Sequence, residues 1–120
     1  YLRPVKYCSG DIVINQGDID RKLYFVESGE LKVDMHIGNG VMHLAAVGAG
    51  SVVGEGSFFS RLPRIAVVTA STDCKVWVLT PEEFDRLSLA NSNVALAVSM
   101  ALGTLLAVRM LDMSKRVTVL

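Results

Sequence analysis

The residue types best suited to binding a charged ligand lie in one short segment, VVGEGSFFSRLPRIA, which runs from Val52 to Ala66. Glu55 carries a carboxylate that can accept hydrogen bonds from hydroxyl groups. Arg64 carries a planar fork of N–H donors that fits a phosphate. An acceptor for hydroxyl groups and a cation for a phosphate, placed in one segment, predict a site for a sugar phosphate.

The backbone around these two side chains favours close contact with a ligand. Gly54 and Gly56 flank the acid, and a residue without Cβ lets a bound molecule approach the main chain. Pro63 fixes φ directly before Arg64 and so restricts the guanidinium. The alternative is a structural ion pair between Glu55 and Arg64. A buried pair is often no better than apolar packing, which favours an external anion as the partner of Arg64.

The segment resembles the phosphate-binding cassette of the cyclic nucleotide-binding domain family, whose pattern reads Gly-Glu, a variable stretch and then Pro-Arg-x-Ala. Gly54-Glu55, Pro63-Arg64 and Ala66 match that pattern. The resemblance extends to the Gly17-Asp18 turn and to the run Tyr24-Phe25-Val26-x-Ser28-Gly29. It implies that Glu55 holds the ribose 2′-hydroxyl group of a cyclic nucleotide and that Arg64 holds its phosphate.

The resemblance also implies roles for the residues that follow Glu55. The backbone amides of Gly56, Ser57 and Phe58, at the start of a short helix, would complete the phosphate cradle. The Ser57 hydroxyl either contacts the phosphate or caps that helix, and both alternatives remain open. Two positions depart from the family pattern. Gly56 replaces a larger aliphatic residue, and Ser60-Arg61-Leu62 replaces a turn that often carries glycine.

Two apolar residues bear on the choice of base. Family members that prefer cyclic GMP often place a hydroxyl group directly after the arginine, whereas this chain has Ile65 there. Because Ile65 can neither donate nor accept a hydrogen bond, cyclic AMP is the expected ligand and cyclic GMP the less favoured one. The alternative is that Ile65 is an ordinary strand residue. Val33, by its position in the family plan, either lines the base pocket or belongs to the core.

The part of the chain before Thr80 is rich in short apolar runs between glycine-bearing turns, as in a β-sandwich or barrel. Asn39-Gly40 predicts a hairpin turn, and further strands are expected over 65–69 and 75–79. The resemblance implies a mainly β fold with C-terminal α-helices. Its double-stranded β-helix (jelly-roll) barrel would span 1–80 and contain the cassette, 54–66.

Two helices are expected after the barrel. Thr80-Pro81-Glu82-Glu83 reads as a capping box and predicts a short helix over 81–90. A break at Asn91 to Asn93 separates it from a long helix over 93–115. The whole chain, 1–120, is then one cyclic nucleotide-binding domain.

The long helix is apolar on nearly every side, so it is expected to be buried against something. Ser99, Gly103 and Ala107 form a stripe of small residues that allows close packing of a second helix. A homodimer through this helix is therefore expected, and a helix folded back on its own barrel is the alternative. A membrane span is not expected, because the uncharged run ends at Arg109 and is shorter than the roughly 20 residues that a bilayer requires.

Composition excludes several classes of function. The formal net charge is zero, so no nucleic-acid or membrane-surface binding is expected. Cys8 and Cys74 form no metal or disulfide pattern and indicate a reducing, cytoplasmic compartment. No DNA-reading module is expected either, because Asp112 to Leu120 is too short for a helix-turn-helix.

Neither a metal, a cofactor nor catalysis is expected. His36 and His43 flank the hairpin and could face each other as a metal or haem pair, but a structural zinc site takes four ligands, so exposed histidines are the preferred interpretation. The Gly-x-Ser-x-Gly elbow and the Walker phosphate loop are both missing.

The leading hypothesis is a cyclic AMP-binding regulatory domain, not an enzyme, in which the ligand draws the cassette and the long helix together. A ligand-free barrel used only for dimerisation is the alternative. A haem or redox sensor on the same fold is a third, weaker one.

Overall fold

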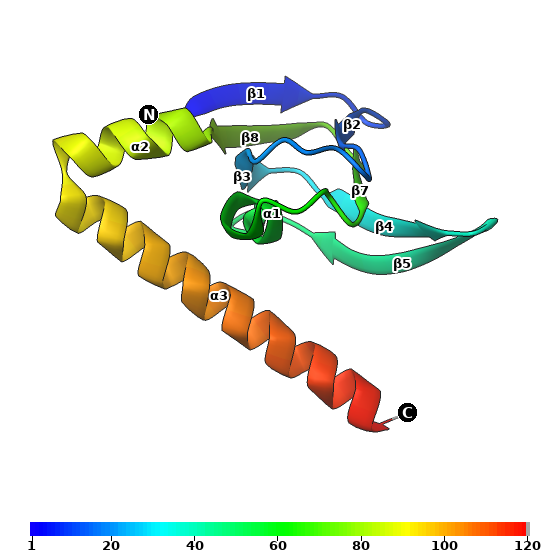
Figure 1. Ribbon diagram of the computed structural model, residues 1–120. Coiled ribbons are helices and arrows are strands. Elements are labelled where there is room, and N and C mark those ends of the chain that lie inside the picture. Colours follow the sequence, from blue (N-terminus) through cyan, green and yellow to red (C-terminus); the bar gives the residue numbers. More distant parts are fainter. Residues whose placement is uncertain (120) are drawn as a thin grey trace. The chain divides into compact units, whose positions relative to one another are not determined.

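The structure is a computed structural model that describes residues 1–119, without the side chains of residues 105, 106 and 109–119. The chain divides into two compact units, Tyr1–Pro81 and Glu82–Leu120. The first unit holds all the strands and one short helix, and the second holds the two C-terminal helices (Figure 1).

The strands form two four-stranded antiparallel sheets. The first sheet has the order β1 (Arg3–Tyr7), β8 (Cys74–Leu79), β3 (Leu23–Ser28), β6 (Val52–Val53). The second has the order β2 (Ile12–Ile14), β7 (Val67–Ala70), β4 (Leu31–Ile37), β5 (Gly40–Val47). Apart from the β4–β5 hairpin, neighbouring strands in each sheet are not consecutive in the chain, as in a jelly roll. The predicted fold class is thus confirmed, although the strands form two sheets and not one closed barrel.

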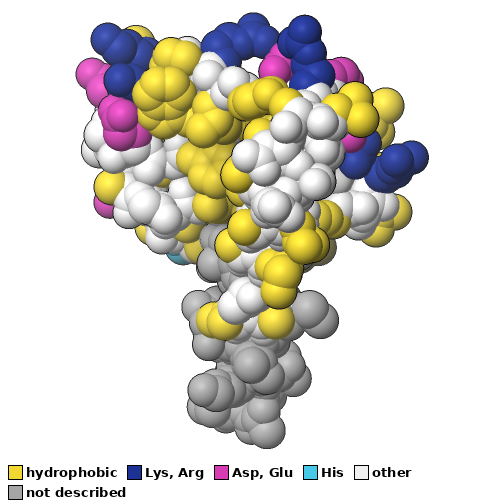
Figure 2. Space-filling view, turned by 90° about the vertical axis from the view of Figure 1, so that its left-hand side faces the viewer, with side chains coloured by type: hydrophobic (Ala, Val, Ile, Leu, Met, Phe, Trp, Pro, Cys, Tyr) yellow, Lys and Arg dark blue, Asp and Glu magenta, His cyan; other side chains and the backbone are white. Residues whose placement is uncertain are grey.

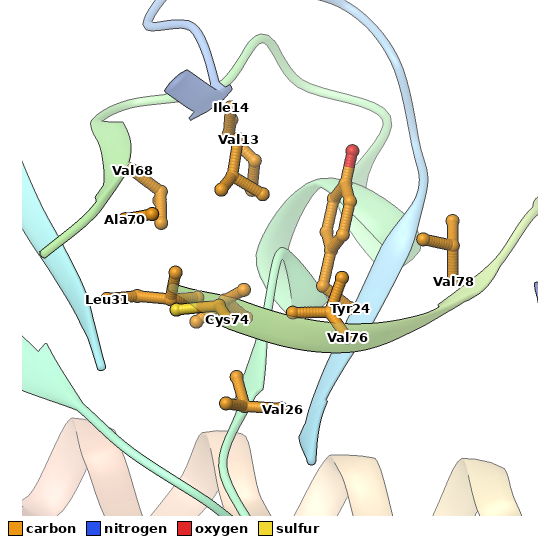
Figure 3. Close-up of a cluster of buried hydrophobic side chains, with 11 residues drawn as sticks. Val13, Ile14, Tyr24, Val26, Leu31, Val68, Ala70, Cys74, Val76 and Val78 are labelled. Atoms are coloured by element: carbon orange, nitrogen blue, oxygen red, sulfur yellow. The ribbon is translucent and has the colours of Figure 1, made fainter. Parts of the chain in front are cut away.

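The core is made by inward-facing side chains of both sheets. In β8 the buried Cys74, Val76 and Val78 alternate with more exposed residues, which is the period-two pattern of a half-buried strand. Val76 is fully buried, as is Leu31 of β4. Figure 3 shows Val13, Ile14, Val68 and Ala70 from the second sheet on the same side of the β8 ribbon as Tyr24 from the first, and Val26 and Val76 belong to the same buried cluster. This core fixes the sheets that carry the cassette.

Two local expectations need correction. The β4–β5 hairpin exists, but Ile37 pairs with Gly40, so the turn residues are Gly38 and Asn39. Gly38 adopts a positive φ, which glycine allows without strain. The strand expected over 65–69 is β7, and it begins only at Val67 because the preceding backbone pairs with another loop.

The cassette and the C-terminal unit contain the helices. The short helix α1 covers Glu55–Ser60. In the second unit α2 covers Pro81–Ala90, as expected, and α3 covers Ser92–Val119, a longer span than the expected 93–115. Asn91 ends α2 and starts α3, since its Oδ1 accepts the Val94 amide at 3.2 Å. Among the described residues, no helix is long and apolar enough to cross a membrane.

Candidate functional site

Arg64 is buried, with only 5% of its surface exposed, and several acceptors hold its guanidinium. Nη2 donates to Asp20 Oδ1 at 2.8 Å and to the Lys22 carbonyl at 2.5 Å. Nε donates to Asp20 Oδ2 at 3.4 Å, and Nη1 donates to the Gly54 carbonyl at 2.9 Å. These contacts fix the plane of the guanidinium beside the start of α1.

Asp20 was not expected as part of the site. It lies in the loop between β2 and β3, and its Oδ1 also accepts the Lys22 amide at 3.1 Å. Burial raises the pKa of Asp20, but hydrogen bonds from Arg64 and Lys22 outweigh burial and hold the pKa below its ordinary value. The carboxylate is therefore charged and neutralises Arg64. Nearby, burial raises the pKa of the Tyr24 hydroxyl to about 12, so this neighbour stays neutral.

The backbone of Arg64 is tied to the same loop. The Gly17 amide donates to the Arg64 carbonyl at 2.7 Å, and the Arg64 amide donates to the Asp18 carbonyl at 2.7 Å. These two bonds explain why β7 does not begin at Ile65. Together with the side-chain bonds to Asp20 and Lys22, they connect both the main chain and the side chain of Arg64 to residues 17–22.

Gly54 is required by both its conformation and its surroundings. It starts α1 in the left-handed region, with φ of 89°. A Cβ at this position would lie 2.6 Å from Arg64 Nη1 and 2.8 Å from the Lys22 carbonyl oxygen. Its carbonyl accepts both Arg64 Nη1 and the Phe58 amide, the latter at 3.1 Å. Gly54 thus joins α1 to the guanidinium.

The cassette helix presents the other expected ligand-binding residues. Glu55, Ser57 and Phe58 are buried, whereas Gly56 is exposed. The Phe58 amide already donates to Gly54 inside the helix, so the part of the phosphate cradle assigned to it is taken up in this state. Ser57 does not cap the helix, because Gly54 is the N-cap and makes no side-chain cap bond. The capping alternative for the Ser57 hydroxyl is therefore wrong, and its contact with a ligand stays a prediction.

The helix ends at Arg61, which has a φ of 61° and is the one non-glycine residue with a positive φ in the described part of the chain. Its amide donates to the Ser57 carbonyl at 3.1 Å, which closes the helix. This is the position where the family pattern often has glycine, and left-handed geometry is the physical reason.

Ile65 and Val33, the two residues expected to influence which base is bound, lie in different surroundings. Ile65 is 71% exposed and lies in the loop before β7, so the interpretation as a strand residue is wrong. Val33 lies on β4 opposite Ala45 and Val68, half-buried against the core. Pro63 is exposed directly before Arg64.

The two histidines do not form a pair. His36 is in register with Val41, and His43 is in register with Asp34. His43 Nδ1 lies 2.8 Å from Asp34 Oδ1, and this hydrogen bond is the main reason why the pKa of Asp34 is lowered. Among the described residues no group of side chains could hold a metal ion. The facing pair considered from the sequence is therefore wrong.

A concavity on the first unit lies away from the cassette. It has a volume of about 340 Å³ and is lined by residues near the ends of β1, β3 and β8: Lys6, Tyr7, Cys8, Ser28, Asp73, Cys74 and Lys75. The predicted site residues are absent from this lining. The chemistry of the cassette, and not the depth of a pocket, marks the candidate site.

Three residues near the cassette escaped sequence reasoning: Asp20, Arg21 and Lys22, which contact Arg64 or α1. The run of charges directly before the apolar strand β3 was the available signal. Charges in a loop are usually solvated, so this signal alone does not indicate a binding site.

Comparison with known proteins bears on the family of the chain. Residues 4–91 match the family described as the cyclic nucleotide-binding domain. A cAMP-dependent protein kinase regulatory subunit of Colletotrichum orbiculare is 35% identical over 86 residues, 72% of this chain and 22% of that protein. A cGMP-dependent protein kinase of Drosophila melanogaster is 27% identical over 88 residues, 73% of this chain and 8% of that protein. The chain thus spans less than a quarter of the length of these relatives.

A solved structure extends the likeness to nearly the whole chain. The crystal structure of a cyclic nucleotide-binding domain from Methylobacillus flagellatus has a TM-score of 0.91 and 26% identity. The match covers 97% of this chain and 66% of that one. The likeness therefore includes the C-terminal helices as well as the sheets.

Proposed function

We propose that this chain, which belongs to the cyclic nucleotide-binding domain family, is a regulatory sensor domain that binds cyclic AMP through its cassette. The observation that carries the proposal is the buried guanidinium of Arg64, oriented by the Gly54 carbonyl at the start of α1. A buried cation with fixed donors is suited to a phosphate, because it is desolvated before the ligand arrives.

The phosphate contact follows from the donors of Arg64. An arginine has five N–H groups, and the four bonds described above leave one on Nη1. In our proposal this N–H donates to the cyclic phosphate. Asp20 neutralises the guanidinium in the absence of ligand, and it competes with the phosphate for the same charge.

The ribose contact is assigned to Glu55. This residue is 7% exposed, and it follows Gly54 directly, so it lies within the same turn as the acceptor of Arg64 Nη1. A carboxylate there can accept the ribose 2′-hydroxyl, and Ser57 can add a hydroxyl contact to the phosphate. The arrangement binds a ligand and supplies no nucleophile with an adjacent base, so we assign binding and not catalysis.

Cyclic AMP is preferred to cyclic GMP in the proposal. Ile65, directly after Arg64, is exposed and offers no hydrogen bond to a guanine amino group. The kinase regulatory subunit that is 35% identical is named for cAMP, whereas the cGMP-dependent kinase is 27% identical. Val33 is assigned to the base pocket. The two free thiols, Cys8 and Cys74, agree with the proposed cytoplasmic location.

We assign to α3 the transmission of the binding signal to the rest of the protein. Hydrophobic side chains lie at the surface in Figure 2, and those that α3 exposes include Leu96, Met100 and Val108. Exposed apolar residues on one helix favour burial against a second copy of the chain. Leu105, Leu106 and Met110, which belong to the same expected interface, have side chains outside the described residues. We propose a homodimer through α3, whose packing changes when the nucleotide binds.

Titration calorimetry of the chain with cyclic AMP and with cyclic GMP tests the function. The expected result is saturable binding of both, with cyclic AMP tighter. Thermal unfolding provides the matching readout, because stabilisation must grow with ligand concentration if the folded state binds the ligand. Absence of binding and of stabilisation by either nucleotide would contradict the proposal.

The second candidate is a ligand-free module that serves only in dimerisation. The observation in its favour is that Asp20 already pairs with Arg64 at 2.8 Å. The same titration separates the two candidates, because this module would remain dimeric and bind neither nucleotide.

A further inference from the structure

Arg21 makes a contact that the expected binding residues do not explain. Its Nη2 donates to the Phe58 carbonyl at 2.9 Å, and this hydrogen bond connects the β2–β3 loop to helix α1. Its Nε is buried and has no hydrogen-bond partner among the described residues. Arg21 is the residue between Asp20 and Lys22, both of which contact Arg64.

The unpartnered Nε makes Arg21 a costly way to stabilise a fold. A buried N–H without an acceptor loses its hydrogen bond to water and gains nothing in return. An apolar side chain of similar length would fill the same space without that loss. The stability of the ligand-free chain is therefore a weak explanation for an arginine at this position.

That contact closes a ring of hydrogen bonds around the cassette. Arg21 holds the Phe58 carbonyl, and the Phe58 amide donates to the Gly54 carbonyl. The same Gly54 carbonyl accepts Arg64 Nη1, and Arg64 Nη2 returns to Asp20, the neighbour of Arg21 in the chain. A shift of α1 would therefore move the Gly54 carbonyl, which is the acceptor that orients Arg64.

We infer that Arg21 is a positioning residue of the nucleotide site, which holds α1 in the place where Gly54 orients Arg64 for the phosphate. This inference rests on the proposed function. Arg21 acts through Phe58 and Gly54 and does not itself touch the ligand.

The test compares Arg21→Met, Arg21→Lys and the matched control Arg3→Met. Arg3 is an exposed arginine on β1, so its replacement removes the same charge away from the cassette. Arg21→Met should weaken cyclic AMP binding roughly three- to tenfold, the range for one ordinary hydrogen bond. The Tm of the ligand-free chain should stay unchanged or rise, because the unpartnered Nε is gone. Arg21→Lys should recover most of the affinity, and Arg3→Met should leave the affinity unchanged.

Hydrogen exchange of the amides in residues 55–60 supplies a readout that needs no ligand. Exchange should be faster in Arg21→Met than in the wild type and near wild type in Arg21→Lys. Wild-type affinity with unchanged exchange in Arg21→Met would overturn the inference. So would a loss of affinity accompanied by a fall in Tm that lysine does not rescue, since that indicates a structural role. If the wild-type chain binds no nucleotide, the proposed function fails, and the exchange data still decide whether Arg21 holds α1.

Discussion

The guanidinium of Arg64 donates to the carboxylate of Asp20 at 2.8 Å, so the cation expected to bind a phosphate already has an acidic partner within its own unit. Asp20 keeps about a third of its side chain exposed, whereas that of Arg64 is almost fully buried. The pair therefore opens to solvent on the side of the acid. In the proposed function an anionic ligand shares Arg64 with Asp20, and this competition sets the expected behaviour of the site.

Replacing Arg64 with alanine should weaken cyclic AMP binding by about 2–3 kcal/mol, or roughly 30- to 150-fold, because a charge-assisted phosphate contact is lost. Titration calorimetry measures the effect. Arg86→Ala is the control, since Arg86 is an exposed arginine on α2 paired with Glu83. Equal affinity of Arg64→Ala and the wild type would remove Arg64 from the site.

Replacing Asp20 with asparagine should raise the affinity for cyclic AMP and lower the stability of the ligand-free chain. The amide oxygen can still accept from Arg64, but the competing negative charge is gone, so cyclic AMP should bind roughly three- to tenfold more tightly. The ligand-free chain should lose about 1–2 kcal/mol of unfolding free energy, because Arg64 loses a charged partner. Calorimetry and urea denaturation measure the two quantities. Weaker binding in Asp20→Asn would show that Asp20 supports the phosphate contact and does not compete with it.

The contribution of Asp20 to stability should depend on pH. Its pKa is lower in the folded chain than the ordinary value of 3.8, so its carboxylate stabilises the fold above that value. This stabilisation is lost as the pH falls through the folded pKa. The difference in unfolding free energy between wild type and Asp20→Asn should thus be constant near neutral pH and shrink below about pH 4. Asp34 has a lowered pKa in both chains, so it cancels in the comparison. A difference that persists at the lowest pH would refute the assignment.

Replacing Gly54 with alanine should disturb the site more than an ordinary loop substitution. The new Cβ would meet Arg64 Nη1 and the Lys22 carbonyl at less than 3 Å, and the residue would be strained at its positive φ. We expect a loss of stability of about 2 kcal/mol and a loss of nucleotide affinity of at least tenfold. Gly50→Ala is the matched control, because Gly50 has a similar positive φ of 86° but a Cβ there meets nothing within 4 Å. Similar affinities in the two variants would contradict this account of Gly54.

Replacing Arg61 with glycine should stabilise the chain by about 0.5–1 kcal/mol, since glycine adopts the left-handed conformation without a Cβ penalty. Thermal unfolding measures the change. Arg86→Gly provides the opposite case, because glycine inside the right-handed helix α2 should cost about 1 kcal/mol. A fall in Tm for Arg61→Gly would mean that the Arg61 side chain makes a contact that outweighs the strain.

Much of the fold could be predicted because it depends on local pattern. The alternation in β4, the turn signal near Gly38 and the capping sequence before α2 each fix a nearby conformation through neighbouring residues. The boundaries of the strands and helices depend less on local pattern. β7 begins at Val67 because the Arg64 backbone pairs with Gly17 and Asp18, which are distant in sequence.

The sequence by itself determined the chemical types at the site: a carboxylate at Glu55, a guanidinium at Arg64 and glycine at Gly54. Only the tertiary structure decided which groups surround them. Asp20 and Arg21 belong to the β2–β3 loop and contact Arg64 and α1 of the cassette. The antiparallel pairing of β3 with β6 places that loop beside α1. The physical reason is that strand pairing brings together residues far apart in the chain, and sequence spacing records no such distance.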